Sequence, residues 1–333
     1  MRYSFIIPVY NRPEEVDELL NSLTRQTNKN FEVLIVEDGS SVPCKEVVDN
    51  YADRLDICYY FKSNSGPGQT RNYGAERGHG EYLIILDSDC ILPEGYLAAV
   101  ESELQRQKAD AFGGPDRAHD SFTNIQKSIN YAMTSFFTTG GIRGGKKKMD
   151  KFYPRSFNMG VRAEVYKALG GFSKMRFGED IDFSIRIFQG GYACRLFPEA
   201  WVWHKRRTDL KKFFKQVHNS GIARINLYKK YPESLKVVHL LPALFTIGIV
   251  FLLLCSLVCS WSLSLLLLFA LIICVDSTLR NKSFKIGLLS IPCFFYSVDW
   301  LWNWFPAGWW KRCVLGKNEF AALRRIFINR ILP

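Results

Sequence analysis

The sequence predicts an α/β fold in which helices cover both faces of a mostly parallel sheet, followed by an apolar membrane region. Two observations predict the sheet. Short apolar runs alternate with helical patterns up to about residue 107, and polar clusters follow these runs at residues 11, 38 and 87–89. A third observation predicts the membrane region, because residues 237–310 are dominated by Leu, Ile, Phe, Val and Trp.

Four short apolar runs are expected to form the parallel strands. In chain order they lie at residues 4–10, 31–36, 57–61 and 82–86. Ligands of such sheets bind beyond the carboxyl ends of the strands. Because Asn11, Asp38 and Asp87 each follow a strand end, three strands should deliver polar side chains to one rim.

Helices are expected between these strands. The first opens at Pro13, and Glu14 and Glu15 lie in its first turn, where the helix dipole favours acidic side chains. Its apolar residues follow the spacing of a half-buried helix, at Val16, Leu19, Leu20 and Leu23. Further helices are predicted at residues 45–51, 69–77, 93–107 and 181–189.

The net charge of +12 favours a membrane surface over nucleic acid, because much of the basic surplus lies beside or after the apolar tail. No nucleic-acid-binding motif accompanies it, and a diphosphate-bearing substrate would also suit it. The nine cysteines are scattered without a CxxC pair. They predict neither a disulfide framework nor a zinc site, and they favour a reducing compartment.

Residues 237–258 and 261–279 are predicted to span a membrane as a tight hairpin, since about 20 apolar residues cross a bilayer core of ~30 Å. Basic flanks put the N-terminal domain on the cytoplasmic side of the inner membrane. The tryptophan-rich stretch 286–305 is expected to be interfacial or re-entrant. The three expected parts are a catalytic domain, a membrane region and a basic amphipathic tail, at residues 1–232, 233–310 and 311–333.

Asp87 and Asp89 follow the most apolar strand, and their spacing of two points both carboxylates to the same side. Magnesium and manganese bind such carboxylates together with substrate phosphates. Asp38 either accepts a hydrogen bond from a nucleobase or stabilises a turn. The glycine-rich turn at residues 64–72 allows the backbone to approach a ligand, and the helix that follows it attracts anions.

These motifs occur in a specific order along the chain. They are Pro8-Val9-Tyr10-Asn11, Glu37-Asp38-Gly39-Ser40, Gly66-Pro67-Gly68 with Arg71-Asn72, Asp87-Ser88-Asp89, Asn158-Met159-Gly160, Gly178-Glu179-Asp180 and His204. As a set covering about residues 1–232, they resemble the inverting family-2 glycosyltransferases of the GT-A fold.

The resemblance implies a site for a nucleotide-sugar donor, with the position of Asp38 recognising the nucleobase, usually uracil. The implied donor-binding residues are Pro8, Tyr10, Asn11, Asp38, Gly68, Arg71, Asp87 and Ser88. A divalent metal, Mn²⁺ or Mg²⁺, is expected on Asp87, Asp89 and His204. For His204, a purely structural role stays open.

Asp180 corresponds to the catalytic base of the family, and Glu179 is expected to orient the acceptor. A sugar hydroxyl is a poor nucleophile at neutral pH, and a positioned carboxylate can take its proton during attack on the anomeric carbon. The metal offsets the charge that builds on the leaving diphosphate. Contacts with the acceptor are expected from Asn158, Gly160 and Trp203.

Two acceptors stay open: a glycan or lipid-linked saccharide of cell-surface polysaccharide biosynthesis, and a polyprenyl phosphate. The chain has no Gln-x-x-Arg-Trp signature after Asp180, which favours transfer of a single sugar over processive synthesis. A non-catalytic membrane scaffold is disfavoured because Asp87, Asp89 and Asp180 are all present. The segment 138–153, rich in glycine and lysine, is either a lid or a solvated loop.

Overall fold

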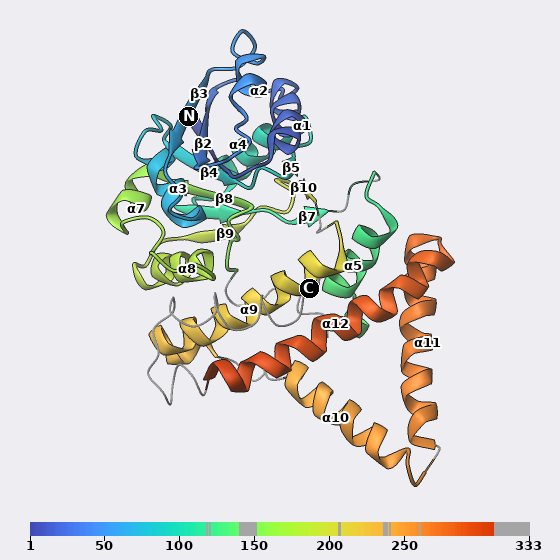
Figure 1. Cartoon of the computed structure of the whole chain (residues 1–333). Coiled ribbons are helices and arrows are strands. Elements are labelled where there is room, and N and C mark those ends of the chain that lie inside the picture. The colour runs from blue at the N-terminus through green and yellow to red at the C-terminus, as the bar shows by residue number, and fades with distance from the viewer. Residues whose placement is uncertain are drawn as a thin grey trace. The chain divides into compact units, whose positions relative to one another are not determined.

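The computed structural model describes residues 1–117, 119, 121–139, 152–205, 208–235, 239, 241–259 and 261–309 (Figure 1). The predicted tail at 311–333 and most of the segment 138–153 lie outside these residues. The chain divides into two compact units, which are residues 1–120 with 147–205, and residues 121–146 with 206–333.

A seven-stranded sheet with the order β3-β2-β1-β4-β8-β6-β9 forms the centre of the first unit. Its strands are β1 (Tyr3–Val9), β2 (Phe31–Asp38), β3 (Ile57–Lys62), β4 (Tyr82–Leu86), β6 (Ala111–Gly113), β8 (Asn158–Arg162) and β9 (Cys194–Leu196). The strands β1 to β4 are parallel, whereas β8 runs antiparallel to both β4 and β6. The mostly parallel α/β sheet is therefore confirmed, with one antiparallel strand that the sequence did not reveal.

Helices cover both faces of this sheet. Those with bounds near the predictions are α1 (Pro13–Thr24), α2 (Lys45–Asp49), α3 (Pro67–Ala75), α4 (Tyr96–Arg106) and α8 (Glu179–Gln189), and α7 (Ala163–Ala168) is additional. Successive strand residues face opposite sides, so Phe5 packs in the cluster with α1 and α4, whereas Ile6 packs in the cluster with α7 and α8. Gly74 of α3 lies close against Ile6, where a Cβ atom would come within 2.7 Å of the isoleucine side chain.

A second, three-stranded sheet brings a distant segment beside the acidic triplet. It has the order β5-β10-β7, with β5 (Cys90–Ile91), β10 (Val202–His204) and β7 (Asp116–Arg117). In the antiparallel pair of β10 with β5, His204 lies opposite Cys90. Cys90, which directly follows the triplet, is therefore paired with His204, the predicted metal ligand.

The second unit is helical. Its helices are α5 (Asn124–Thr134), α6 (Phe136–Thr139), α9 (Leu210–Lys230), α10 (Leu241–Cys255), α11 (Trp261–Asn281) and α12 (Phe284–Trp309), with a 3₁₀ turn at Pro232–Ser234. Ile129 of α5 and Phe213 of α9 pack with Cys293 of α12. Because α5 and α9 share this core with α12, the unit begins before the boundary expected at residue 232.

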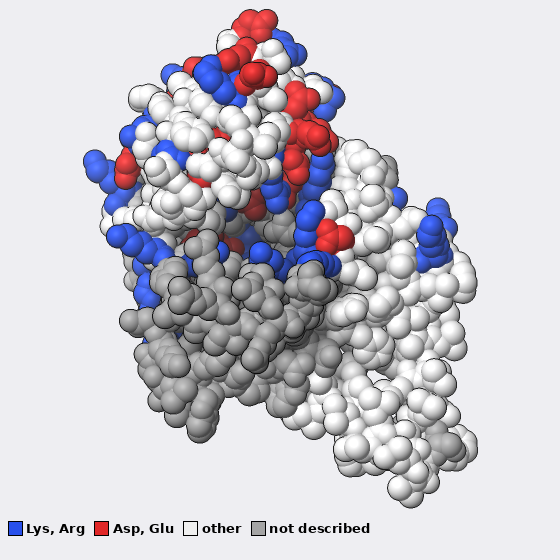
Figure 2. Space-filling model, in the orientation of Figure 1, with Lys and Arg blue, Asp and Glu red and all other residues white. Residues whose placement is uncertain are grey.

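Among the described helices, α11 alone is long and apolar enough to cross a membrane, with a mean hydropathy of 2.2. The shorter apolar stretches Leu244–Cys255 and Phe284–Ser297 flank it in sequence. The face drawn in Figure 2 is uncharged over α10 and the adjoining half of α11. The predicted spans at 237–258 and 261–279 overlap α10 and α11, and α12 runs as one helix through the stretch 286–305. A bilayer crossing by α10 and an interfacial or re-entrant placement of 286–305 stay predictions.

Candidate active site

The turn after β1 directs Arg12 toward the acidic triplet. Asn11 has a left-handed backbone, with φ of 53°. Its amide donates to the Ser40 hydroxyl over 2.8 Å, and its side-chain oxygen accepts the Val42 amide over 3.0 Å. Arg12 follows at the N-cap of α1 without a side-chain capping bond. Its Nη1 atom lies 2.5 Å from Oδ2 of Asp89. Burial acts to lower the pKa of Arg12, but Asp89, with Glu15 and Asp87 nearby, raises it above its usual value.

Asp38, at the end of β2, holds the glycine-rich turn. Its two carboxylate oxygens accept the backbone amides of Ser65 and Gly66, each over 2.9 Å, and the carboxylate also bonds the Lys62 ammonium. Burial acts to raise the pKa of Asp38, but the hydrogen bonds lower it by more, so the pKa lies below its usual value. The carboxylate is therefore ionised and anchored in the turn, and its contact with a nucleobase stays a prediction.

Arg71 forms ion pairs with both the acidic triplet and the first residue of α8. Its guanidinium lies 2.8 Å from Oδ1 of Asp87 and 3.0 Å from Oε1 of Glu179, and its side chain is only 4% exposed. The ring of Phe172 lies 5.3 Å from the guanidinium carbon. Arg71 thus joins α3, the strand end at Asp87 and the first turn of α8.

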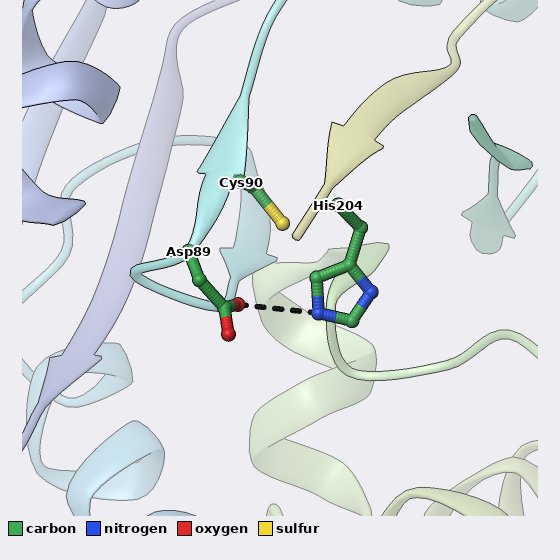
Figure 3. Close-up of side chains that lie close together, drawn as sticks. All are labelled: Asp89, Cys90 and His204. Atoms are coloured by element: carbon green, nitrogen blue, oxygen red, sulfur yellow. Dashed lines mark ion pairs between the residues drawn. The ribbon is translucent and has the colours of Figure 1, made fainter. Parts of the chain in front are cut away.

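Asp89 and His204 face each other (Figure 3). Oδ1 of Asp89 lies 3.1 Å from Nε2 of His204, and Oδ2 of Asp87 lies 4.0 Å from the same nitrogen. Two ligands about 2.1 Å from a divalent ion and at right angles to each other are about 3 Å apart. The Asp89–His204 pair therefore fits adjacent positions around one ion.

Cys90 completes a group of three residues with ligand atoms within 4.8 Å of one another (Figure 3). Burial, and then the charge of Asp89, raise the pKa of its thiol well above the usual value. The thiol lies 3.4 Å from the Phe157 carbonyl, and the Phe157 ring stacks on His204 at 4.8 Å. Apart from this thiol, the group offers carboxylate oxygens and an imidazole nitrogen, which are ligands that Mn²⁺ or Mg²⁺ accepts.

Glu179 and Asp180 begin α8 with their side chains turned to different partners. Glu179 faces Arg71, while Oδ2 of Asp180 lies 2.7 Å from Nε of Arg155. Burial, and the nearby charge of Asp180, raise the pKa of Glu179 against the opposing effect of Arg71. Glu179 is therefore paired with Arg71, and its predicted contact with the acceptor stays a prediction.

The other predicted donor residues lie around the same strand ends. Tyr10 is 53% exposed just beyond β1, Pro8 is partly buried within it, and Ser88 is buried in the triplet. Gly68 packs closely, because a Cβ atom there would lie 3.3 Å from Phe172 and 3.4 Å from Glu179. The small residue lets the start of α3 approach the start of α8.

The three predicted acceptor residues have different surroundings. Asn158 is fully buried, and a Cβ atom at Gly160 would lie 2.0 Å from the Phe112 ring. Trp203 is partly exposed and packs edge-on against Trp201 at 4.7 Å. Because strand residues alternate, it lies on the side of β10 opposite His204. Asn158 and Gly160 therefore make close contacts within the fold, and an acceptor contact of any of the three residues stays a prediction.

Replacing Asn158 with alanine is expected to destabilise the fold by about 2–4 kcal/mol, because two buried polar groups lose their partners. The Tyr96 hydroxyl donates to Asn158 Oδ1 over 2.6 Å, and Asn158 Nδ2 donates to the Ala200 carbonyl over 2.8 Å. Denaturant unfolding measures the loss, and the exposed Asn21→Ala in α1 is the matched control. A fully stable Asn158→Ala chain with weakened acceptor binding would instead support the predicted contact of Asn158 with the acceptor substrate.

Some residues of this site carried no signal in the sequence. They are the partners of the predicted carboxylates, namely Arg12, Lys62 and Arg155, and the ring partners Phe157 and Phe172. Arg12 directly follows the Pro8–Asn11 motif, and this position in the sequence could have indicated that it belongs to the site. The others are ordinary basic or aromatic residues until the fold places them at the rim.

A mostly parallel α/β sheet with carboxylates at its strand ends and a histidine beside them is consistent with the GT-A class of glycosyltransferases. Residues 4–170, about half of the chain, match the model of glycosyl transferase family 2. The chain therefore belongs to glycosyl transferase family 2.

Known proteins resemble the chain over different lengths. An uncharacterized glycosyltransferase of Rickettsia felis is 33% identical over 137 residues, which cover 41% of this chain but only 22% of that protein. Glycosyltransferase AglE of Haloferax volcanii is 27% identical over 259 residues, or 71% of this chain and 79% of AglE. The chain thus matches about a fifth of the rickettsial protein and most of AglE.

Among solved structures, the mannosyltransferase PcManGT from Pyrobaculum calidifontis, in complex with GDP-Man and Mn²⁺, shares the fold. The superposition has a TM-score of 0.62 and covers 91% of this chain and 87% of PcManGT at 17% identity. This similarity confirms the predicted GT-A architecture.

Proposed function

We propose that the chain is an inverting, metal-dependent glycosyltransferase anchored at the cytoplasmic face of a membrane. It moves one sugar from a nucleoside diphosphate sugar, with a UDP-sugar as the first candidate, to a saccharide or lipid-linked acceptor in cell-surface polysaccharide biosynthesis. One observation supports this proposal most strongly: the chemically active side chains lie together at one edge of the sheet. They are Asp87, Asp89, His204, Arg71, Glu179 and Asp180.

The donor lies at the strand ends of β1, β2 and β4. Arg71 is buried beside Asp87, and a guanidinium matches the oxygens of a diphosphate. Asp87 is 32% exposed and so accessible to a ribose or a metal ion. PcManGT was solved with GDP-Man, so a guanosine donor is a second candidate beside a uridine donor.

Asp89 and His204, with Asp87, would hold Mn²⁺ or Mg²⁺. The 3.1 Å spacing of Asp89 Oδ1 and His204 Nε2 supports this, as does the Mn²⁺ bound to PcManGT. When bound, such an ion offsets the negative charge that develops on the leaving diphosphate.

Asp180 takes the proton of the attacking acceptor hydroxyl. The oxygen forms a bond to the anomeric carbon as the bond from that carbon to the diphosphate breaks, and attack from the opposite face inverts the carbon. Both oxygens of Asp180 have partners, Ile181 N at 2.8 Å and Arg155 Nε at 2.7 Å. Each carboxylate oxygen has a further lone pair, so Asp180 can accept the proton with both partners in place, and Arg155, whose side chain is 42% exposed, flanks it. Glu179 positions Arg71.

The polyprenyl-phosphate alternative keeps the same donor site and changes the nucleophile to a phosphate oxygen. The half-exposed Arg155 beside Asp180 favours it, because a guanidinium binds phosphate well. A screen of UDP- and GDP-sugars against membrane extracts, with identification of the product, separates the two acceptors. If no nucleotide sugar is consumed, the proposed function fails.

Replacing Asp89 with alanine is expected to remove metal-dependent donor binding. Loss of even an indirect contact typically costs a metal site about 10–100-fold in affinity, and Asp89 would contact the ion directly. Calorimetry of UDP and GDP binding, with and without Mn²⁺, measures the effect. Asp49→Ala, which breaks the exposed pair with Lys45, serves as the control. Nucleotide binding that still strengthens with Mn²⁺ would remove Asp89 from the metal site.

Membrane anchoring through the second unit is supported by its exposed apolar side chains. Leu257, Val258 and Trp261, at and beside the turn between α10 and α11, are 83%, 94% and 79% exposed. Such a patch is costly in water and favourable in a bilayer. The helix α11 is long enough for a crossing.

A further inference from the structure

The two carboxylates of the acidic triplet are each paired with a guanidinium of the chain. Asp87 bonds Arg71 over 2.8 Å, and Asp89 bonds Arg12 over 2.5 Å. Arg71 also bonds Glu179, so its place in the donor site has a second support. Arg12 has no role in the proposed function so far.

The position of Arg12 leaves room for an ion at Asp89. Arg12 binds Oδ2, whereas Oδ1 faces Nε2 of His204. An ion held by Oδ1 and Nε2 therefore does not need to displace the guanidinium. The Arg12 side chain is 31% exposed and the Asp89 side chain 7%, so the pair stands at the edge of the site with the carboxylate inside.

The charge of Arg12 acts against a bare divalent ion. Even in a medium as polar as water, a unit positive charge about 6 Å away weakens the binding of a divalent cation by about tenfold. A nucleoside diphosphate reverses this balance, because its negative charges attract both the ion and the guanidinium. The same side chain thus opposes the ion alone and favours the complex of ion and nucleotide.

We propose that Arg12 makes metal binding conditional on the nucleotide. In the empty site it neutralises Asp89, so the bare ion binds weakly. In the loaded site its positive charge attracts the negative diphosphate, so ion and nucleotide bind cooperatively. The inference rests on the proposed metal site, and it assigns a coupling role to a residue outside the acidic triplet. By reciprocity, the ion and the nucleotide strengthen each other by the same factor.

A purely supporting role for Arg12 predicts the opposite sign. If Arg12 only orients the Asp89 carboxylate, its removal should weaken metal binding, as the loss of hydrogen bonds to metal ligands usually does. If Arg12 acts through its charge, its removal should strengthen the binding of the bare ion. The direction of the change therefore decides between the two roles.

The experiment is a calorimetric titration of Mn²⁺ into the 333-residue chain, solubilised in detergent, alone and with saturating UDP or GDP. Arg12→Gln removes the charge but keeps a hydrogen-bond donor, and Arg12→Lys keeps the charge. We expect Arg12→Gln to bind bare Mn²⁺ about tenfold more tightly, and the strengthening by nucleotide to shrink by the same factor. Arg12→Lys should behave as the wild type does.

Arg2→Gln is the matched control, because Arg2 pairs with Asp56 over the same 2.5 Å but at side chains 48% and 58% exposed. It should change neither affinity. Unchanged or weaker Mn²⁺ binding in Arg12→Gln overturns the inference. If that variant does not fold, the wild-type chain still tests the inference. Nucleotide that strengthens wild-type Mn²⁺ binding by less than about tenfold also overturns the inference. A wild type that binds no Mn²⁺ under any condition instead removes the metal site itself.

Discussion

Asp180→Asn is expected to lower kcat by about 10²–10⁴-fold while leaving the affinity for the nucleotide nearly unchanged. The amide cannot take the proton of the acceptor hydroxyl, yet it keeps the size and much of the hydrogen bonding of the carboxylate. Asp180 bonds Arg155 and its own helix, and Arg71 holds the donor side through Glu179 and Asp87. Turnover is measured with the donor and acceptor found by the nucleotide-sugar screen, and affinity by calorimetry with UDP and GDP.

Asp182→Asn, two positions along the same helix, provides the contrast. Asp182 is fully buried and bonds Arg186, which in turn donates to the carbonyls of Leu169 and Gly171 over 2.6 Å. This change should lower stability and leave the chemistry of the folded fraction intact. If Asp180→Asn turns over at the wild-type rate, a proton-accepting role is excluded. A polyprenyl-phosphate acceptor, whose oxygen is already ionised, would then be the better explanation.

Local patterns explain why so much of the sheet could be predicted. An apolar run such as Tyr82–Leu86 forms a buried strand, and the spacing in Pro13–Thr24 forms an amphipathic helix, wherever the rest of the chain lies. The convergence of Asp38 and Asp87 followed from topology, because parallel strands end at one edge. Hydrogen bonds that join the end of β1 to the ends of β2 and β4, from Asn11 to Ser40 and from Arg12 to Asp89, confirm that the strand ends meet there.

Contacts between distant segments could not be predicted in this way. The pair of Arg12 and Asp89 joins positions 77 apart, and a lone arginine has no sequence signal for its partner. The antiparallel β8 and the pairing of β10 with β5 likewise depend on segments far apart in the chain. Asn158 belongs to a family motif, but the motif did not reveal that the Asn158 side chain forms hydrogen bonds with Tyr96 and Ala200.

Arg71→Met is expected to abolish donor binding and to cost about 3 kcal/mol of folding stability at neutral pH. Removing one partner of a buried ion pair leaves an uncompensated charge, which typically costs about 3–5 kcal/mol. Two carboxylates lose the same partner here, since Arg71 bonds both Asp87 and Glu179. The lower figure applies because Asp87 is partly exposed, so water screens its charge.

The stability loss should depend on pH, and its sign follows from Glu179. Burial already holds the pKa of this carboxyl above its usual value, and loss of the Arg71 charge raises that pKa further. A group that binds its proton more readily in the folded state destabilises the fold fully above the folded-state pKa, and this penalty fades as the pH falls from that value to the unfolded-state pKa. The Arg71→Met chain should therefore recover stability relative to the wild type as the pH falls through the raised pKa of Glu179.

Denaturant unfolding at several pH values measures this recovery, and Arg77→Met is the matched control. Arg77 lies just beyond α3, the helix that carries Arg71, but its side chain is 35% exposed and its ion-pair partner Glu76 is 73% exposed. The control should lose little stability at any pH. A stability loss for Arg71→Met that is equal at all pH values would show that Glu179 does not carry the buried charge. Intact nucleotide binding would show that the diphosphate is held elsewhere on the rim.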